Sequence, residues 1–147
     1  MLILLSALWL NSLAIAGNVA QQIVTFQVNA ISELSINGGS NHLSIAIGEK
    51  STTDYVCWAI TTNETSKRVI GSIDADMPPG ATLFVQLEAP TESLSKGPVI
   101  VSTTPKTLVA DISKVAEKSL GLTYMLFVDG NVEMSQRVLT LTLTDGL

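Results

Sequence analysis

Residues that could catalyse a reaction are scarce in this chain. Its 147 residues include a single histidine, His42, and a single cysteine, Cys57. The common hydrolytic classes need a nucleophile, a base and a group that orients the base. His42 lies in the polar sequence SNH, and Cys57 lies in the apolar run YVCWAI, with no neighbouring cation to favour a thiolate. We therefore expect a solvated histidine and a protein that is not an enzyme.

Cys57 has no second cysteine in the chain with which to form an internal disulfide. Its apolar neighbours favour a buried, small hydrophobic residue. A disulfide between two chains is the alternative that the sequence leaves open. The stability of the domain must therefore come from packing.

Two acidic clusters offer oxygen atoms of the kind that calcium accepts. Asp74 and Asp76 lie at the end of a predicted strand, and Asp129 and Asn131 lie in a predicted turn. Neither cluster has the spacing or the downstream glutamate of an EF-hand loop. Because Asp and Asn in turns usually bond the nearby backbone, we expect no metal and no cofactor, although calcium binding stays open.

Phe84 is the aromatic residue most suited to contact a ligand. It falls on the polar side of its predicted strand, together with Thr82, Gln86 and Glu88. Carbohydrate-binding sandwiches usually present a row of exposed aromatic residues, whereas one exposed aromatic is normal on any surface. Phe84 is therefore a candidate contact for a polysaccharide and no more than that.

The first sixteen residues differ in composition from the rest of the chain. Thirteen of them are apolar and none is charged, and the run ends in Ala14-Ile15-Ala16. This pattern predicts a signal peptide over residues 1–16, with cleavage after Ala20 as the alternative. Residues 17–147 then form the mature domain, which we expect to be secreted or at the cell surface, in the periplasm or outside the cell.

The formal net charge of −5 limits the partners of the mature domain. Nucleic acids and anionic membrane surfaces need a basic footprint, which this composition does not provide. We therefore expect protein partners, through self-association or in the cell envelope, and consider polysaccharide as well.

Short alternating runs and turn clusters fill the mature chain. The stretch SKRVIGSIDADMPPGATLFVQLEA predicts strands over residues 67–74 and 82–89, joined as a hairpin by a turn at residues 77–80. Further strands are predicted at residues 24–28, 34–36, 43–47, 54–62, 98–103, 108–112, 120–126 and 137–144. Residues 90–97 read as a loop and residues 114–118 as a short helical turn.

This spacing is typical of an all-β protein. It predicts a single antiparallel β-sandwich, immunoglobulin-like or pilin-like, of about nine short strands. The run at residues 54–62 is apolar on both faces, so we place it centrally, with Trp58 in the core.

The first predicted strand has two possible partners. Val24, Phe26 and Val28 alternate with Thr25 and Gln27, as in a strand with one buried face. The run could pair within its own domain, or it could insert as an added strand into a neighbouring subunit. Insertion requires a free N-terminus, which leader cleavage provides.

The stretches TTNETSKRVIGSIDADMPPGATLFVQLEAPTES and VSTTPKTLVADISKVAEKSLGLTYML resemble small secreted bacterial β-sandwich proteins of the fimbrial or spore-coat-subunit type. The chain departs from typical fimbrial subunits in lacking a cysteine pair. The resemblance implies a structural or adhesive role in the cell envelope or outside the cell. A monomeric module that binds carbohydrate or another ligand is the alternative.

Overall fold

The computed structural model describes residues 22–38, 43, 48–52 and 56–147. Within these ranges every regular element is a strand, and no helix is long and apolar enough to cross a membrane. The strands are β1 Ser32–Asn37, β2 Lys50–Thr52, β3 Val56–Thr62, β4 Lys67–Ile73, β5 Ala81–Leu87, β6 Leu94–Ser95, β7 Val99–Ile100, β8 Lys106–Ile112, β9 Val115–Val128 and β10 Leu139–Asp145. The predicted leader, His42 and most of the predicted strand at residues 43–47 lie outside the described residues.

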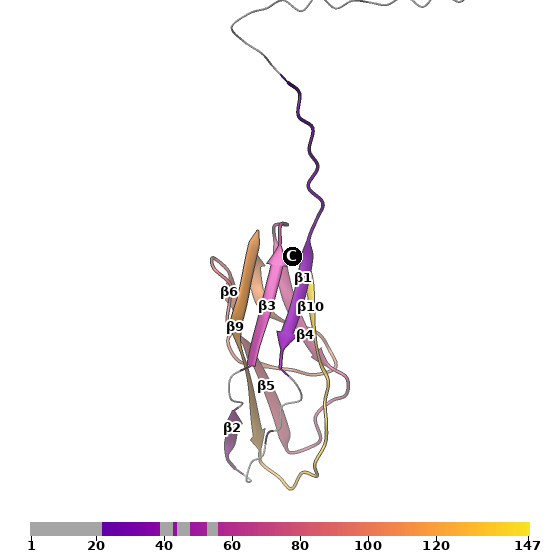
Figure 1. The fold of residues 1–147 in the computed structure, drawn as a ribbon. Helices are drawn as coiled ribbons and strands as arrows, with labels where there is room; N and C mark the ends of the chain where they lie inside the picture. The colour runs from indigo at the N-terminus through magenta and orange to yellow at the C-terminus, as the bar shows by residue number, and fades with distance from the viewer. Residues whose placement is uncertain (1–21, 39–42, 44–47, 53–55) are drawn as a thin grey trace, which may run out of the picture.

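The strands form two antiparallel sheets that pack face to face (Figure 1). One sheet has the order β1-β3-β9-β5-β7, with β2 also paired to β9, and the other has the order β10-β4-β8-β6. The predicted all-β sandwich is therefore confirmed. Strand β3 lies between β1 and β9, which confirms its predicted interior position.

The core forms because alternate residues of the strands face the opposite sheet. In β3, β4 and β5 the buried residues recur at every second position, the period of side chains along a strand. Trp58 is completely buried, as its sequence context predicts. Its indole Nε1 has no hydrogen-bond partner among the described residues, so packing alone holds this side chain.

The Pro-Pro-Gly corner turns the chain as predicted, but it does not close a hairpin. The N–H of Ala81 donates to the carbonyl of Pro78 at 3.1 Å, and Gly80 has a φ of +85°. Strand β4 pairs with β8 and β10, whereas β5 pairs with β7 and β9. The corner therefore carries the chain from one sheet to the other, because each strand finds partners that are distant in sequence.

Other local predictions are wrong in detail. Residues 115–118 belong to β9, not to a helical turn, because from Val115 onward this segment pairs with β3. The predicted loop at residues 90–97 contains β6, and the strand predicted from Pro98 to Thr103 is reduced to β7. In each case pairing with a neighbouring strand decides the outcome over the weak local pattern.

Candidate subunit-contact segment

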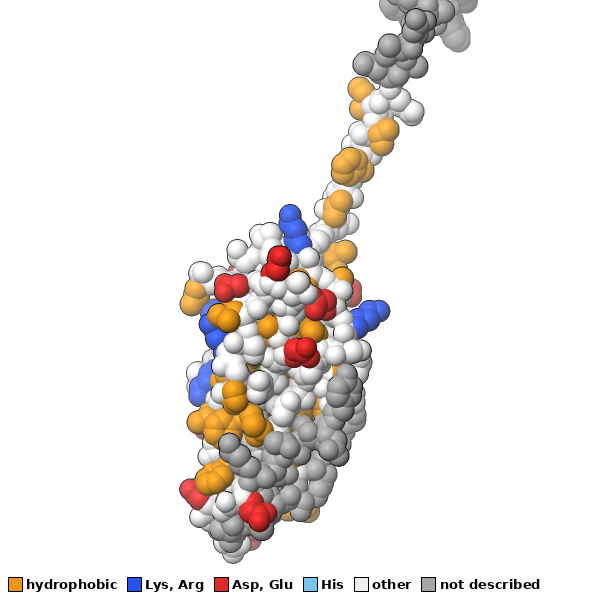
Figure 2. All heavy atoms as spheres, turned by 90° about the vertical axis from the view of Figure 1, so that its left-hand side faces the viewer, with side chains coloured by type: hydrophobic (Ala, Val, Ile, Leu, Met, Phe, Trp, Pro, Cys, Tyr) orange, Lys and Arg blue, Asp and Glu red, His pale blue; other side chains and the backbone are white. Residues whose placement is uncertain are grey.

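Residues 22–30, which we call the N-terminal segment, extend away from the sandwich instead of pairing with it (Figure 1). The prediction of a strand within the domain at residues 24–28 is therefore wrong. The side chains of Ile23, Val24, Phe26 and Val28 are 93%, 73%, 84% and 73% exposed, respectively. Figure 2 shows these hydrophobic side chains along a thin stalk above the sandwich.

This exposure is unusual for residues of these types. Large apolar side chains are normally removed from water, and a row of them outside the core commonly marks an interaction site. The segment has the alternation of a strand but makes no ladder with any strand that the structure describes. It therefore has the side chains for a buried strand and no pairing partner among the described residues of its own domain.

Asn63 holds the base of the N-terminal segment. Its Oδ1 accepts a hydrogen bond from the N–H of Ile31 at 2.8 Å, and its Nδ2 donates to the carbonyl of Asn29 at 2.7 Å. The N–H of Asn63 also donates to the carbonyl of Ile31 at 3.2 Å. These three bonds fix the point and the direction at which the segment leaves the sandwich.

A chain of polar contacts joins this exit point to the end of β10. The Ser32 hydroxyl donates to Glu64, whose carboxylate lies 3.0 Å from Lys67, and the Lys67 Nζ lies 2.6 Å from Asp145. Hydrogen bonding from Ser32 and then Lys67 lowers the pKa of Glu64, and the bond from Lys67 lowers the pKa of Asp145. Strand β10 therefore ends at the same end of the sandwich from which the segment departs.

Phe84 lies on the outer face of its sheet and is half-buried. It pairs across the sheet with Ile100 of β7 and Met125 of β9, so the three residues form a row on three adjacent strands. Ile100 is 48% exposed. The sequence pointed to Phe84 but not to its two neighbours, because the order of the strands was unknown. The row forms an apolar patch on the outer face of the sheet, apart from the depression lined by Lys96 and Asp111 and from the one lined by Thr61 and Val115.

In the first acidic cluster, the side chains of Asp74 and Asp76 bond the backbone. Asp74 Oδ1 accepts from the N–H of Val138 at 2.8 Å, and Asp76 Oδ1 accepts from the N–H of Thr103 at 3.0 Å. The latter bond lowers the pKa of Asp76. Among the described residues, no three His, Cys, Asp or Glu side chains are grouped as metal ligands, and Asn131 is exposed.

Cys57 is half-buried, on the face of β3 opposite Trp58. It pairs with Asn37 of β1 and Gly121 of β9, so it is less enclosed than the sequence predicts. The sequence prediction overestimated the burial of Cys57 because both faces of β3 carry apolar residues. Only the face that carries Trp58 packs against the other sheet.

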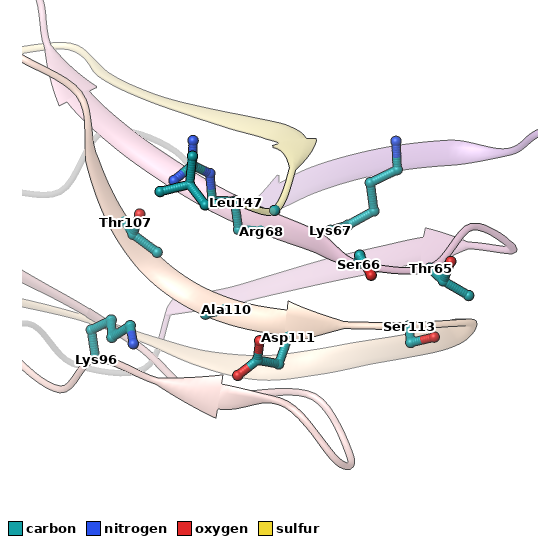
Figure 3. Close-up of a pocket in the computed structure, with 11 residues that line it drawn as sticks. Thr65, Ser66, Lys67, Arg68, Lys96, Thr107, Ala110, Asp111, Ser113 and Leu147 are labelled. Atoms are coloured by element: carbon teal, nitrogen blue, oxygen red, sulfur yellow. The ribbon is translucent and has the colours of Figure 1, made fainter.

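The outer face of the second sheet carries a shallow depression of about 420 Å³. Its polar lining includes Lys67, Arg68, Lys96 and Asp111. In Figure 3 the side chains of Lys67 and Arg68 point away from Lys96 and Asp111, so the charged groups do not converge on one point. This arrangement does not resemble a ligand site.

Comparison with protein-family models, curated proteins and solved structures finds no match to this chain. Its function must therefore be argued from its own geometry.

Proposed function

We propose that this protein is a secreted structural or adhesive subunit of the cell envelope or the extracellular space. It binds other copies of itself through its N-terminal segment and its edge strands and has no active site. The observation that carries the proposal is the exposed apolar row Val24, Phe26 and Val28 on a segment that leaves the sandwich without pairing with any described strand.

The energetics favour an added strand over a loose apolar contact. Burying three side chains of this size stabilises a complex by roughly 5–9 kcal/mol. Association costs about 4–15 kcal/mol in lost freedom, so these side chains alone leave little margin. The backbone hydrogen bonds of an added strand contribute about 0.5–1.5 kcal/mol each and shift the balance towards binding.

The test is the mass in solution of the chain from Gly17 onward, by light scattering, with electron microscopy of the same sample. We expect large oligomers or filaments. The triple substitution Val24→Thr, Phe26→Thr and Val28→Thr should convert them to monomers with an unchanged circular dichroism spectrum. Threonine keeps the preference for extended backbone while removing most of the apolar area.

The matched control alters the polar side of the same segment. Thr25→Ser with Gln27→Ser should leave the oligomers intact, because these side chains alternate with the apolar row. A wild-type chain that stays monomeric at high concentration contradicts the proposal, as does a triple variant that assembles like the wild type.

A second candidate function rests on the row formed by Phe84, Ile100 and Met125. Such a row could bind a polysaccharide on the outer face of the sheet, in a protein that acts as a monomer. Binding to a glycan array that is lost in Phe84→Ala would favour this function. An array without any binding would count against it.

A further inference from the structure

The edge strands on the two sides of the sandwich differ in how well they are protected against pairing with another chain. On one side, β6 and β7 are each two residues long, and Lys96 and Pro98 lie between them. The N–H of Lys96 donates to the carbonyl of Leu108 at 2.9 Å, so this connection runs along β8 and covers its edge. Short strands, lysine and proline are the features that block strand addition.

The other side has no such protection among the described residues. Here β10 is seven residues long and pairs only with β4, while the neighbouring β1 pairs only with β3. β10 has no proline, and its one charged residue is the last, Asp145. Its outer edge is therefore a long, uncharged row of unpaired backbone groups.

Apolar side chains at this edge are incompletely covered. Leu139, Leu141 and Leu143 pack against the core but are only partly buried, and Ile36 of β1 is 38% exposed. Thr140 and Thr142 face the solvent. The edge thus presents an alternating apolar and polar strand that a matching strand would complete.

We infer that the outer edge of β10 receives the N-terminal segment of a second copy, in antiparallel pairing, and that this pairing propagates as an open chain of subunits. The inference rests on the proposed function and names the acceptor, the direction and the assembly type that it requires.

Length and alternation fit this assignment. The nine residues of the segment reach about 30 Å when extended, whereas a strand of seven residues spans about 23 Å. The segment contains no charged residue, like β10 before Asp145. An antiparallel register that pairs Val24 with Leu143, Phe26 with Leu141 and Val28 with Leu139 places all six apolar side chains on the core side.

The direction follows from where the segment leaves the sandwich. It departs at the end where β10 finishes and points away along the long axis (Figure 1). In a copy of the same orientation that is displaced along this axis and lies partly beside the first, the segment enters at the Leu139 end of β10 and runs antiparallel to it. Each copy then offers its own segment onward, and such a head-to-tail contact leaves the chain open. A closed pair of opposed copies would require parallel pairing instead.

Disulfide trapping separates these arrangements in the Cys57→Ala background of the chain from Gly17. Antiparallel pairing places Ile23 opposite Thr144, and parallel pairing places it opposite Val138; directly paired residues lie within the Cα range of a disulfide. We expect Ile23→Cys with Thr144→Cys to give a ladder of covalent multimers on a non-reducing gel. The matched variant, Ile23→Cys with Val138→Cys, should remain largely uncrosslinked.

A second set of cysteine variants keeps the test conclusive if one variant of the first set folds poorly. Thr25→Cys with Thr142→Cys should crosslink, and Thr25→Cys with Thr140→Cys should not. Covalent dimers from the Val138 or Thr140 variants overturn the inference and leave the proposed function standing. Oligomers that neither set traps also overturn it, because the segment then binds elsewhere. Absence of oligomers in the parent chain removes both proposals.

Discussion

The N-terminal segment and β5 have the same alternation of apolar and polar residues, but only β5 is buried. In β5, Leu83, Val85 and Leu87 alternate with more exposed residues and are buried in the core. In the segment, Val24, Phe26 and Val28 alternate in the same way and are exposed. The difference lies in the neighbours: β5 pairs with β7 and β9, whereas the segment is held at its base and points away. The alternation of apolar and polar residues therefore predicts a strand with one face suited to burial. It does not predict whether that face is buried by the same chain or by another molecule.

The largest effect on stability that we predict contrasts two aromatic residues. Trp58→Ala should lower the free energy of unfolding by about 3–5 kcal/mol, because it empties the centre of the core. Phe26→Ala, at an 84% exposed site, should change the unfolding of the monomer by less than about 0.5 kcal/mol. Urea denaturation at a dilution at which light scattering detects only monomer measures both.

Trp58→Phe sharpens this contrast. It should cost less than Trp58→Ala, because it retains an aromatic ring and removes a buried N–H that has no partner among the described residues. Equal losses for Trp58→Ala and Phe26→Ala would show that the segment is part of the folded domain after all.

The second prediction concerns the close packing of β4 against its neighbours. A Cβ at Gly71 would lie 2.6 Å from Leu108 Cδ1 and 3.4 Å from Leu141 Cδ2. Gly71→Ala should therefore lower the free energy of unfolding by about 1–3 kcal/mol through overpacking. Adding Leu108→Val should recover part of the loss, since it shortens the clashing side chain. A neutral Gly71→Ala would mean that Leu108 moves aside without cost.

A smaller effect is expected at Asn63, where the two regions meet. Asn63→Ala removes the bonds to Ile31 and Asn29, so the free energy of unfolding should fall by about 0.5–1.5 kcal/mol. Hydrogen exchange should also show faster exchange at the Ile31 N–H. Asn63→Asp keeps the acceptor for Ile31 and serves as the matched control; it should preserve protection there. Equal exchange in Asn63→Ala and the wild type would contradict the role of this residue.

The smallest effect is a dependence on pH at the same end of the sandwich. The pKa values of Glu64 and Asp145 are lowered from their usual 4.5 and 3.8. Their contribution to the free energy of unfolding is therefore complete above pH 4.5 and is lost as the pH falls through the lowered pKa values. The pKa of Lys67 is raised from its usual 10.5. The contribution of Lys67 to the free energy of unfolding is therefore present below pH 10.5 and is lost as the pH rises through the raised pKa.

Thermal unfolding measured against pH checks this prediction. The midpoint should stay level between these limits and decline slightly in acid, and Asp145→Asn should reduce the decline. Because Asp145 is exposed and Glu64 and Lys67 are only partly buried, 1 M salt should weaken the effect. A decline in acid that Asp145→Asn and Glu64→Gln both leave unchanged would assign it to other carboxylates.

Sequence reasoning identified the fold class and most of the strands because strand periodicity is local. The alternating residues of β3, β4, β5, β8 and β10 gave their strands within a few positions, and the burial of Trp58 followed from its apolar surroundings. The predictions were wrong at residues 114–118 and 94–95, where the local pattern is weak and pairing with a neighbouring strand determines the secondary structure.

The apolar face of residues 24–28 and the scarcity of groups for catalysis can be read directly from the amino acids. The fold was needed to show that this face stays outside the domain, that Asn63 directs it away, and that β10 ends at the same end with an edge unpaired among the described residues. The cause is that alternation is a property of consecutive residues, whereas strand pairing joins residues that are distant in the chain. Which edge stays unpaired depends on where every other strand lies.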